Sequence, residues 1–471
     1  MKQINEHFIN GIFVKSIGTE IQDLYNPSTA QLIGTVQLGN KNDVDAAIAA
    51  AKTAFLSFSR TSLKERAEIL DRLYNSVIEK EKELNDLAIL EYGSPITATM
   101  GRTKAAAHAF LTAKEAMFEL EFIKEYGNSM IVKEPLGIVG AITPWNADYN
   151  HICAKIAPAI AAGCTIVVKP SEFSALQTQL LSECFLNADI PSGIINIVNG
   201  TGAVAGVTLV NHPDISMISF TGSTSTGKII GKQAMDTMKR VTLELGGKSP
   251  NILLDDCDLS KAIPLALQIA FSNSGQACHA GTRLIVPRSK MDEIRPLLVQ
   301  EVNNLKIGKL YDTDSVIGPM VNAPQFDKVQ SYIRKGVEEG AELLVGGLGN
   351  PDGLGGWYVK PTVFVNVSSD MSIAKEEIFG PVLSVIAYDT EEEAIAIAND
   401  TVYGLSGYIS SDNLERAKKV ASKMFSGRVI INKAVNTELK SPFGGFKESG
   451  IGRTGWVYGI EFHLEPKVIA F

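Results

Sequence analysis

Hydrophobic positions along the chain follow two alternating patterns. Residues Asp43–Phe55 repeat alanine and other apolar residues at helical spacing, and Ser62–Glu65 has the form of a capping box that opens a second helix, expected to end by Gly93. Later come short apolar runs flanked by helical patterns: IVGAIT, TIVVKP, IINIVN, ISMISFTG, SPNILL, LIVP, LSVIAY and GRVIIN. Buried strands that alternate with helices predict an α/β protein with mostly parallel sheets.

Length and charge narrow the class of protein. A chain of 471 residues is too long for one ordinary core, so we expect two or three domains. The net charge of −8 is spread along the chain without a Lys/Arg-rich block, which argues against a nucleic-acid partner. The N-terminus has no signal-like apolar stretch, and the apolar run Ile156–Val168 is interrupted by Pro158 and Gly163. We therefore expect a cytoplasmic protein without a membrane partner.

Cysteine usage singles out one residue. There are five cysteines, an odd number, with no CxxC pair and no spacing typical of a metal or disulfide framework. Reduced thiols and no metal site are expected. Cys278 lies in FSNSGQACHAGTR, among small and polar residues that offer little apolar surface to pack against. That setting makes Cys278 a candidate for chemistry.

Glycine loops follow two of the predicted strands. Gly222–Lys228 reads GSTSTGK and fits the first seven positions of a P-loop, but Ile229 stands where a magnesium-binding Ser or Thr is required. This disfavours a nucleotide-dependent phosphotransferase and leaves a strand that turns into a helix, a geometry that binds anions. Gly200-Thr-Gly202 follows another strand. Neither segment has the full G-x-G-x-x-G pattern, so a structural turn is the alternative for each.

Polar residues lie near the ends of the predicted strands. Lys169 and Glu172 follow TIVV, where open α/β sheets bind ligands, although two solvated charges at a helix start would look the same. Asn146 in TPWN, Glu244 in LELGGKSP and Cys278 are a carboxamide, a carboxylate and a thiol. They could act as oxyanion donor, base and nucleophile, but their spacing does not show that they meet.

A family resemblance joins these pieces. The segments TPWN, KPSE, FTGST, LELGGKSP, GQACHAGTR, EEIFGPV and SPFGGFKESGIGR occur in the order found in the NAD(P)-dependent aldehyde dehydrogenase superfamily, which the chain resembles over essentially its whole length. The resemblance implies oxidation of an aldehyde to the carboxylic acid through a thiohemiacetal and a cysteine thioester. It assigns Cys278 as the nucleophile, Asn146 with the Cys278 backbone N–H as oxyanion donors, and Glu244 as the base that activates water. Relatives that pass the acyl group to coenzyme A usually lack this carboxylate, so hydrolysis is favoured.

The resemblance also implies a cofactor site. NAD is expected, with NADP possible, because a carboxylate at Glu172 should repel a 2′-phosphate. The residues implied for cofactor binding are Trp145, Lys169, Ser171, Glu172, Gly202, Phe220, Gly222, Ser223, Gly246, Glu377 and Phe379. Lys155 and Glu465 match a pair that relays protons from the base, although an ordinary ion pair would look identical.

Two departures concern the substrate. Ala147 replaces a bulky residue that commonly lines the aldehyde pocket in relatives, and Asp148 adds a charge. We therefore expect a wider and more polar entrance. His279 follows Cys278 directly, but adjacent side chains usually point apart, so a pocket-lining or packing role is favoured over a Cys–His dyad.

The resemblance implies the architecture of the family. Residues 1–113 and 136–246 should form a Rossmann-like NAD-binding domain, and residues 247–445 an α/β catalytic domain. Residues 114–135 and 455–471 should form a small β oligomerisation extension, giving a homodimer or homotetramer. The C-terminal tail alternates like a strand, and an unpaired strand would be an aggregation risk for a monomer. An inactive scaffold protein is the remaining alternative, disfavoured by the intact set of Cys278, Glu244 and Asn146.

Overall fold

The computed structural model describes residues 1–436 and 438–471 and contains two large sheets. The first has the strand order β22-β12-β11-β8-β9-β10-β2-β3, with parallel pairing from β12 to β10 and antiparallel pairs at both edges. Its strands are β2 (Glu6–Ile9), β3 (Ile12–Lys15), β8 (Ile138–Ile142), β9 (Thr165–Lys169), β10 (Ile195–Ile197), β11 (Ile215–Thr221), β12 (Arg240–Glu244) and β22 (Gly450–Ile451). Apolar strands at the centre of a parallel sheet require helices on both faces.

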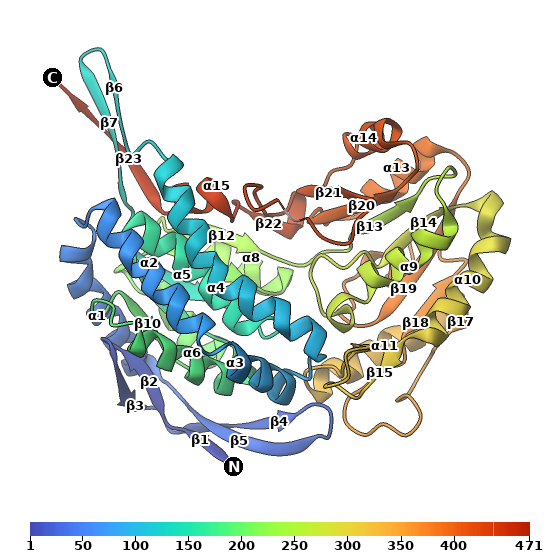
Figure 1. The fold of residues 1–471 in the computed structure, drawn as a ribbon, viewed down its shortest axis with the longest axis horizontal. Helices are drawn as coiled ribbons and strands as arrows, with labels where there is room; N and C mark the ends of the chain where they lie inside the picture. The colour runs from blue at the N-terminus through green and yellow to red at the C-terminus, as the bar shows by residue number, and fades with distance from the viewer. Residues whose placement is uncertain (437) are drawn as a thin grey trace.

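Helices cover both faces of this sheet (Figure 1). In β9, Ile166 and Val168 pack toward one layer of helices and Val167 toward the other, as the pleat of a strand dictates. The helices are α1 (Lys41–Phe58), α2 (Leu63–Ile78), α3 (Glu81–Leu87), α4 (Ile96–Glu119), α5 (Asp148–Ala162), α6 (Ala175–Asn187), α7 (Val207–Asn211) and α8 (Thr224–Met235). The predicted capping box of Ser62 and Glu65 is present at the start of α2. This helix ends at Ile78, before Gly93 as expected, and α3 with a further helical turn follows and is capped at Gly93.

The second sheet has the order β17-β18-β19-β14-β13-β20-β21 and is parallel except for β17. Its strands are β13 (Pro250–Leu253), β14 (Arg283–Pro287), β17 (Glu342–Val345), β18 (Thr362–Val365), β19 (Val382–Tyr388), β20 (Ser406–Ser410) and β21 (Arg428–Ile431). The helices that follow β13 along the chain are α9 (Leu259–Ala270), α10 (Met291–Asn304), α11 (Ala323–Glu338), α12 (Ser372–Lys375), α13 (Glu391–Asn399), α14 (Leu414–Ala421) and α15 (Trp456–Glu461). All eight runs predicted as strands form strands in one of the two sheets.

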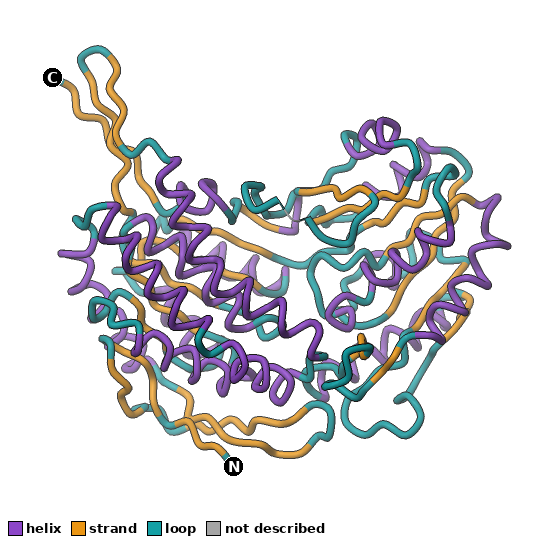
Figure 2. Tube along the Cα trace, viewed as in Figure 1, coloured by secondary structure: helices purple, strands orange, loops and turns teal. Residues whose placement is uncertain are grey.

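Three small sheets complete the fold (Figure 2). They contain β1 (Lys2–Ile4), β4 (Glu20–Asn26) and β5 (Gln31–Leu38), then β15 (Lys306–Ile307) and β16 (Ser315–Ile317), then β6 (Ile123–Tyr126), β7 (Ser129–Pro135) and β23 (Leu464–Ala470). The last three strands project from the body of the molecule near the C-terminus (Figure 1). Strand β23 pairs antiparallel with β7, and no other strand among the described residues pairs with its second edge.

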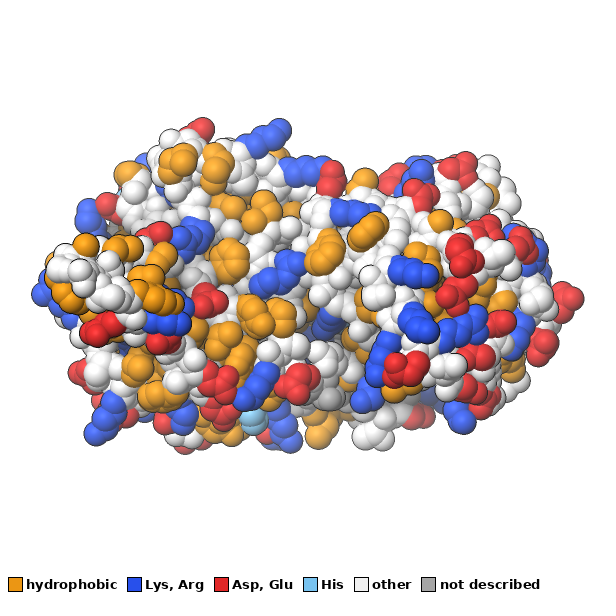
Figure 3. All heavy atoms as spheres, turned by 90° about the horizontal axis from the view of Figure 1, so that it is seen from above, with side chains coloured by type: hydrophobic (Ala, Val, Ile, Leu, Met, Phe, Trp, Pro, Cys, Tyr) orange, Lys and Arg blue, Asp and Glu red, His pale blue; other side chains and the backbone are white. Residues whose placement is uncertain are grey.

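The surface is mixed in charge. On the face seen in Figure 3, acidic and basic side chains are interspersed, and apolar side chains gather over the projecting strands. Among the helices that the structure describes, none is long and apolar enough to cross a membrane.

Candidate active site

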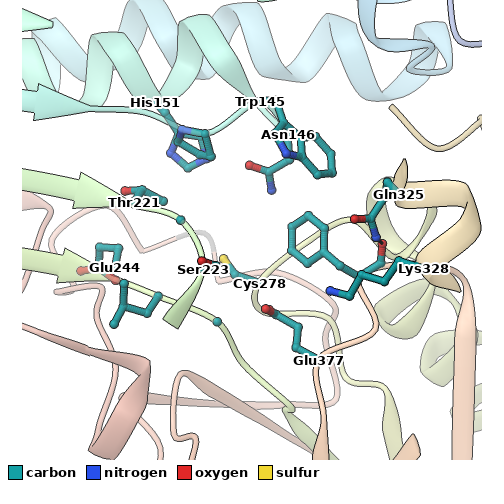
Figure 4. Close-up of a pocket in the computed structure, with 15 residues that line it drawn as sticks. Trp145, Asn146, His151, Thr221, Ser223, Glu244, Cys278, Gln325, Lys328 and Glu377 are labelled. Atoms are coloured by element: carbon teal, nitrogen blue, oxygen red, sulfur yellow. Dashed lines mark hydrogen bonds between the residues drawn. The ribbon is translucent and has the colours of Figure 1, made fainter. Parts of the chain in front are cut away.

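A cavity of about 180 Å³ lies at the carboxyl ends of the central strands of the first sheet, against loops of the second (Figure 4). Segments far apart in the sequence meet there: the loop after β8, the turn after β11, the end of β12, the loop before β14, α11 and the loop before β19. The lining residues are Pro144, Trp145, Asn146, His151, Thr221, Gly222, Ser223, Glu244, Leu245, Gly246, Cys278, Gln325, Lys328, Glu377 and Phe379. The three candidates for nucleophile, base and oxyanion donor therefore share one cavity.

Cys278 reaches this cavity from a loop with unusual backbone geometry. Asn273, Ser274 and Gly275 have φ values of 51°, 58° and 74°, the left-handed region that strains most L-residues. A Cβ on Gly275 would stand 2.1 Å from the carbonyl oxygen of Gly380, so only glycine fits. The small residues around the cysteine thus allow the loop to approach its neighbours closely.

Burial and nearby carboxylates control the thiol. The pKa of Cys278 is raised to about 12, first by burial and then by the charges of Glu377 and Glu244. The double glycine of LELGGKSP keeps these groups close, because a Cβ on Gly246 would stand 2.5 Å from the Glu377 carboxylate. A pKa this far above neutral keeps the resting thiol protonated at neutral pH.

Asn146 follows β8 and is 8% exposed. Its side-chain Nδ2 donates to the backbone carbonyl of Gln276 at 3.0 Å, which fixes the amide beside the cysteine loop. Gln276 is itself anchored, since its side chain donates to the Pro319 carbonyl and accepts from the Val321 N–H. The amide therefore has a rigid partner on one side and the cavity on the other.

Glu244 is the last residue of β12, a strand that the sequence pattern did not reveal. The pairing of β12 with β11 and β22 sets Glu244 opposite Thr221 and Gly450. The side chain is 7% exposed, and neither carboxylate oxygen has a hydrogen-bond partner among the described residues. Burial raises the pKa of Glu244, and the positive charge of Lys155 opposes that rise. A buried carboxylate with free oxygens is suited to accept a proton.

Lys155 lies on α5 and belongs to this group. Its Nζ donates to the Ser219 hydroxyl at 2.9 Å, and the Thr242 hydroxyl donates to the same oxygen at 3.0 Å. Burial lowers the pKa of Lys155, while the charge of Glu244 opposes that change. Glu465 does not join the group. Its side chain on β23 is 56% exposed and pairs with Arg240 at 2.5 Å, and no hydrogen bond or ion pair joins it to Lys155 among the described residues.

The residues expected to bind a cofactor divide into two sets. Six line the cavity with the cysteine: Trp145, Gly222, Ser223, Gly246, Glu377 and Phe379. Ser223 caps the N-terminus of α8, Glu377 accepts from the Gly247 N–H at 3.0 Å, and the Trp145 and Phe379 rings meet edge to face at 5.4 Å. An aromatic pair and a helix N-terminus thus face one space.

The other five lie outside the cavity wall. Lys169 ends β9 and its Nζ pairs with Glu172 at 3.0 Å, while Ser171 caps the short helical turn that follows. Gly202 begins a helical turn after β10. Phe220 is buried within β11. Its ring occupies the space that a Cβ at Gly222 would need. Lys169, Glu172 and Gly202 lie at or just beyond the carboxyl ends of β9 and β10.

Sequence reasoning missed several residues of the wall. Gln325 and Lys328 come from α11, and the Gln325 Nε2 donates to the Phe379 carbonyl at 2.8 Å. His151 points into the cavity from α5 (Figure 4), and burial lowers its pKa to about 3, so the imidazole is neutral. Thr221 and Leu245 complete the wall beside their predicted neighbours. His151 lies in the first turn of the helix that follows TPWN, and this position is the only feature of the sequence that pointed to the cavity.

The expectation of a charged substrate entrance is corrected. Asp148 was expected to add charge to the substrate entrance, but it is 1% exposed and its Oδ2 accepts from the Thr178 hydroxyl at 2.9 Å. Burial raises its pKa, and it does not line the cavity. The carboxyl group lies instead at the start of α5, where it faces Thr178 of α6.

The P-loop interpretation also finds no support. Lys228, the lysine of GSTSTGK, lies on α8 and pairs with Glu448 at 2.7 Å near the surface. His279 lies outside the described cavity wall, and burial lowers its pKa to about 4.

Comparison with known proteins agrees with this geometry. The sequence model of the aldehyde dehydrogenase family matches residues 13–469. The chain belongs to this family. A 3-succinoylsemialdehyde-pyridine dehydrogenase from Pseudomonas sp. is 43% identical over 472 residues, covering 100% of this chain and 99% of the relative.

Solved structures of aldehyde dehydrogenases show the same fold. A mutant of aldehyde dehydrogenase C from Pseudomonas syringae, in complex with NAD+ and octanal, is 43% identical with a TM-score of 0.97 and covers 99% of this chain and 96% of that one. The Mycobacterium tuberculosis enzyme with NAD+ is 38% identical with a TM-score of 0.96, at 100% and 98% coverage. The predicted superfamily, enzyme class and fold class are therefore confirmed.

Proposed function

We propose that the chain oxidises an aldehyde to the corresponding carboxylic acid with NAD as the hydride acceptor. The observation that carries this proposal is the single cavity shared by Cys278, Asn146 and Glu244. A thiol, an amide donor and a carboxylate around one space are the groups that acyl chemistry needs. The Pseudomonas syringae and Mycobacterium tuberculosis relatives bind NAD+, which supports the choice of cofactor.

The residues present fit this cofactor. The N-terminus of α8 at Ser223 directs backbone N–H groups and a positive helix end toward a pyrophosphate. In this proposal the Lys169–Glu172 pair beyond β9 binds the adenosine ribose hydroxyls, and the half-buried carboxylate of Glu377 binds the nicotinamide ribose. A carboxylate at Glu172 repels a 2′-phosphate, which favours NAD over NADP. The chemistry that NAD supplies here is acceptance of a hydride, that is two electrons and one proton, from the substrate carbon.

The first half of the reaction forms a bond to sulfur. The Cys278 thiol loses its proton to Glu244, whose raised pKa makes it a stronger base than an exposed carboxylate. As the sulfur–carbon bond forms, the carbonyl electron pair moves to oxygen, where the Asn146 amide and the Cys278 backbone N–H stabilise it. Loss of hydride from this thiohemiacetal restores the carbonyl and leaves a thioester on Cys278.

The second half hydrolyses the thioester. Glu244 takes a proton from water while the water oxygen attacks the acyl carbon, and the carbon–sulfur bond then breaks with its electron pair returning to Cys278. Glu244 releases the thiol proton to solvent before this step and the second proton after it, and the positive charge of Lys155 favours return of the ionised carboxylate each time. The presence of Glu244 favours hydrolysis over transfer of the acyl group to coenzyme A.

The substrate is an aldehyde that carries a polar group. The polar residue that would contact such a substrate is His151, whereas Asp148 lies outside the cavity. The neutral imidazole of His151 lines the cavity and offers one hydrogen-bond donor and one acceptor. Ala147, the residue after Asn146, is not among the residues that line the cavity. One relative is named for a semialdehyde of pyridine and another was solved with octanal, so aldehydes of both polar and aliphatic kinds belong in the assay.

Assembly and domain roles complete the proposal. The first sheet, formed largely within residues 1–113 and 136–246, binds the cofactor, and residues 247–445 supply the nucleophile. The projecting strands within residues 114–135 and 455–471 join chains into a homodimer or homotetramer through the free edge of β23. The protein works in the cytoplasm, where its five free cysteines stay reduced.

One assay tests the reaction. NADH absorbance is followed with purified enzyme, NAD and a panel of aldehydes, for the wild type and for Cys278→Ala. Turnover by the wild type and its loss in the variant are expected, with carboxylic acid released in equal amount to NADH. Aldehyde-dependent NADH formation by Cys278→Ala would assign the chemistry to another residue, and its absence in the wild type with every aldehyde would overturn the proposal.

A further inference from the structure

The Asn273 side chain touches four groups around the candidate nucleophile's loop. Its Nδ2 lies 3.0 Å from the carbonyl oxygen of Asn146, 3.0 Å from that of Gln276 and 2.9 Å from the Tyr92 hydroxyl. Its Oδ1 accepts from the Arg102 guanidinium at 2.9 Å. One amide thus joins the segment after β8, the cysteine loop and α4.

The arginine determines which way the Asn273 amide stands. A guanidinium has only donors, so the amide oxygen must face Arg102 and the nitrogen must face the two carbonyls. The opposite orientation would set Oδ1 against the carbonyl oxygens of Asn146 and Gln276, leaving acceptors without donors.

The Gln276 carbonyl is a shared acceptor. It receives hydrogen bonds from the Nδ2 atoms of both Asn273 and Asn146. An amide nitrogen carries two hydrogens, so the bond from Asn146 to Gln276 uses one and fixes the plane in which the other points. Because Asn273 holds both the Asn146 backbone and the Gln276 carbonyl, it fixes the two ends of that bond.

We propose that Asn273 is a positioning residue that aims the free N–H of Asn146 at the substrate oxygen, and that Arg102 fixes the Asn273 amide in the orientation this requires. The inference rests on the proposed function, since the oxyanion belongs to that reaction. Asn273 acts through Asn146 and does not touch the substrate.

A backbone role for Asn273 is the alternative, because its φ of 51° is left-handed and asparagine tolerates that region better than most residues. Asn273→Asp separates the two roles. Aspartate keeps the size, the left-handed tolerance and an acceptor for Arg102, but it cannot donate to either carbonyl. Asn273→Gly also accepts the backbone geometry and removes the amide entirely.

The experiment measures the rate of NADH formation in the first turnover, at saturating NAD and aldehyde. Asn273→Asp and Asn273→Gly are expected to slow it roughly 10- to 100-fold, the scale of a misplaced catalytic group. NAD affinity is expected to stay near wild type in the Asp variant, whereas its Tm is expected to fall somewhat because an aspartate oxygen then faces the two carbonyl oxygens. Arg102→Met is expected to lower the rate in the same direction by a smaller factor, because Asn273 keeps its donors but loses its fixed orientation.

A double variant tests the route through Asn146. In an Asn146→Ala background, Asn273→Asp is expected to change the rate by less than roughly twofold, because the group it positions is gone. An unchanged rate for the single Asp variant, or the same loss in both backgrounds, overturns the proposal. Asn432→Asp is the matched control: Asn432 is also left-handed, with φ 56°, and its amide bonds the Ser411 backbone away from the cavity.

Failure of the proposed function would look different. In that case the wild type forms no NADH, whereas failure of the positioning role leaves the wild type active and the Asp variant unimpaired. A crystal structure of Asn273→Asp decides the matter without an assay. Retention of the 3.0 Å contact between Asn146 Nδ2 and the Gln276 carbonyl, with the amide unrotated, would overturn the proposal in either case.

Discussion

The side-chain nitrogen of Asn146 lies 3.0 Å from the backbone carbonyl oxygen of Gln276, the second residue before Cys278. This bond ties the proposed oxyanion donor to the loop that carries the sulfur. Donor and nucleophile loop are therefore already joined before a substrate binds. Such preorganisation is the main source of electrostatic stabilisation in acyl-transfer sites.

Loss of that donor should slow the chemical step. For Asn146→Ala we expect kcat to fall about 10²- to 10³-fold, equivalent to about 3–4 kcal/mol of barrier, because one oxyanion donor is removed. NAD binding, measured by fluorescence titration, should be unchanged, since the amide faces the substrate oxygen. A kcat within a few-fold of wild type would show that Asn146 does not hold the oxyanion.

Removal of the proposed base should trap the acyl-enzyme. In Glu244→Gln the amide cannot take a proton from water, so hydrolysis of the thioester stalls. At alkaline pH the thiol ionises without a base, and the variant should still form one thioester on Cys278. Intact-protein mass spectrometry after mixing with NAD and aldehyde should show the added acyl mass. Cys278→Ala is the control and should show none; steady turnover by Glu244→Gln would point to another base.

The buried lysine should set the pH range of hydrolysis. Glu244 works as a base only when it is deprotonated, so kcat should rise with pH through its raised pKa and then level off. The charge of Lys155 favours the ionised carboxylate. In Lys155→Met that charge is lost, so the pKa of Glu244 rises further and the rising limb of the profile moves to higher pH.

Glu465 provides the control for this profile. Its carboxylate lies at the surface beside Arg240, so Glu465→Gln should leave the rising limb in place. If the rising limb of the kcat profile moves in Glu465→Gln and stays fixed in Lys155→Met, Glu465 rather than Lys155 sets its position. That result would support the role for Glu465 expected from the sequence.

The pattern of apolar runs was sufficient to predict strands that are buried on both faces, such as β9 and β11, because a continuous apolar run is what a central parallel strand requires. It did not reveal β12, whose Arg240 and Thr242 break the run. These polar residues are explained only by partners from other segments: Arg240 binds Glu465, and Thr242 donates to Ser219. Strand pairing through side-chain contacts of this kind has no local signature.

The site residues also fall into two groups: those that a sequence motif identifies and those that only contacts between distant segments explain. Cys278, Glu244 and Asn146 lie in motifs that a family resemblance identifies, and the structure brings them to one cavity. Burial of Asp148 could not be predicted, since it depends on Thr178 of α6 lying opposite. The role of Asn273 likewise depends on contacts between three segments, none of which has a motif for it.

The free edge of β23 should be required for assembly. Val468 and Ile469 on this strand are 65% and 40% exposed in the single chain. A lysine at such an edge blocks pairing with another strand without disturbing the chain's own fold. Light scattering should give a dimer or tetramer for the wild type and a smaller species for Ile469→Lys. A wild-type monomer at micromolar concentration would contradict the proposed assembly.

The neutral imidazole in the cavity should select among aldehydes. His151→Leu keeps the approximate volume of the side chain and removes both hydrogen-bonding nitrogens. We expect kcat/KM for an aldehyde with a pyridine ring to fall about 10-fold, the cost of one lost hydrogen bond of roughly 1.4 kcal/mol. The value for octanal should stay level or rise, because leucine adds apolar surface to the wall.

Measuring both aldehydes with the same variant distinguishes loss of a hydrogen bond to the substrate from misfolding of the cavity. A misfolded cavity lowers both values together, whereas loss of a hydrogen bond lowers only the polar one. His108→Leu is the control, since this histidine is exposed on α4 and bonds its own helix backbone at Lys104. If His151→Leu lowers both values equally while the control lowers neither, the imidazole supports the fold of the cavity and the specificity must come from another part of the wall.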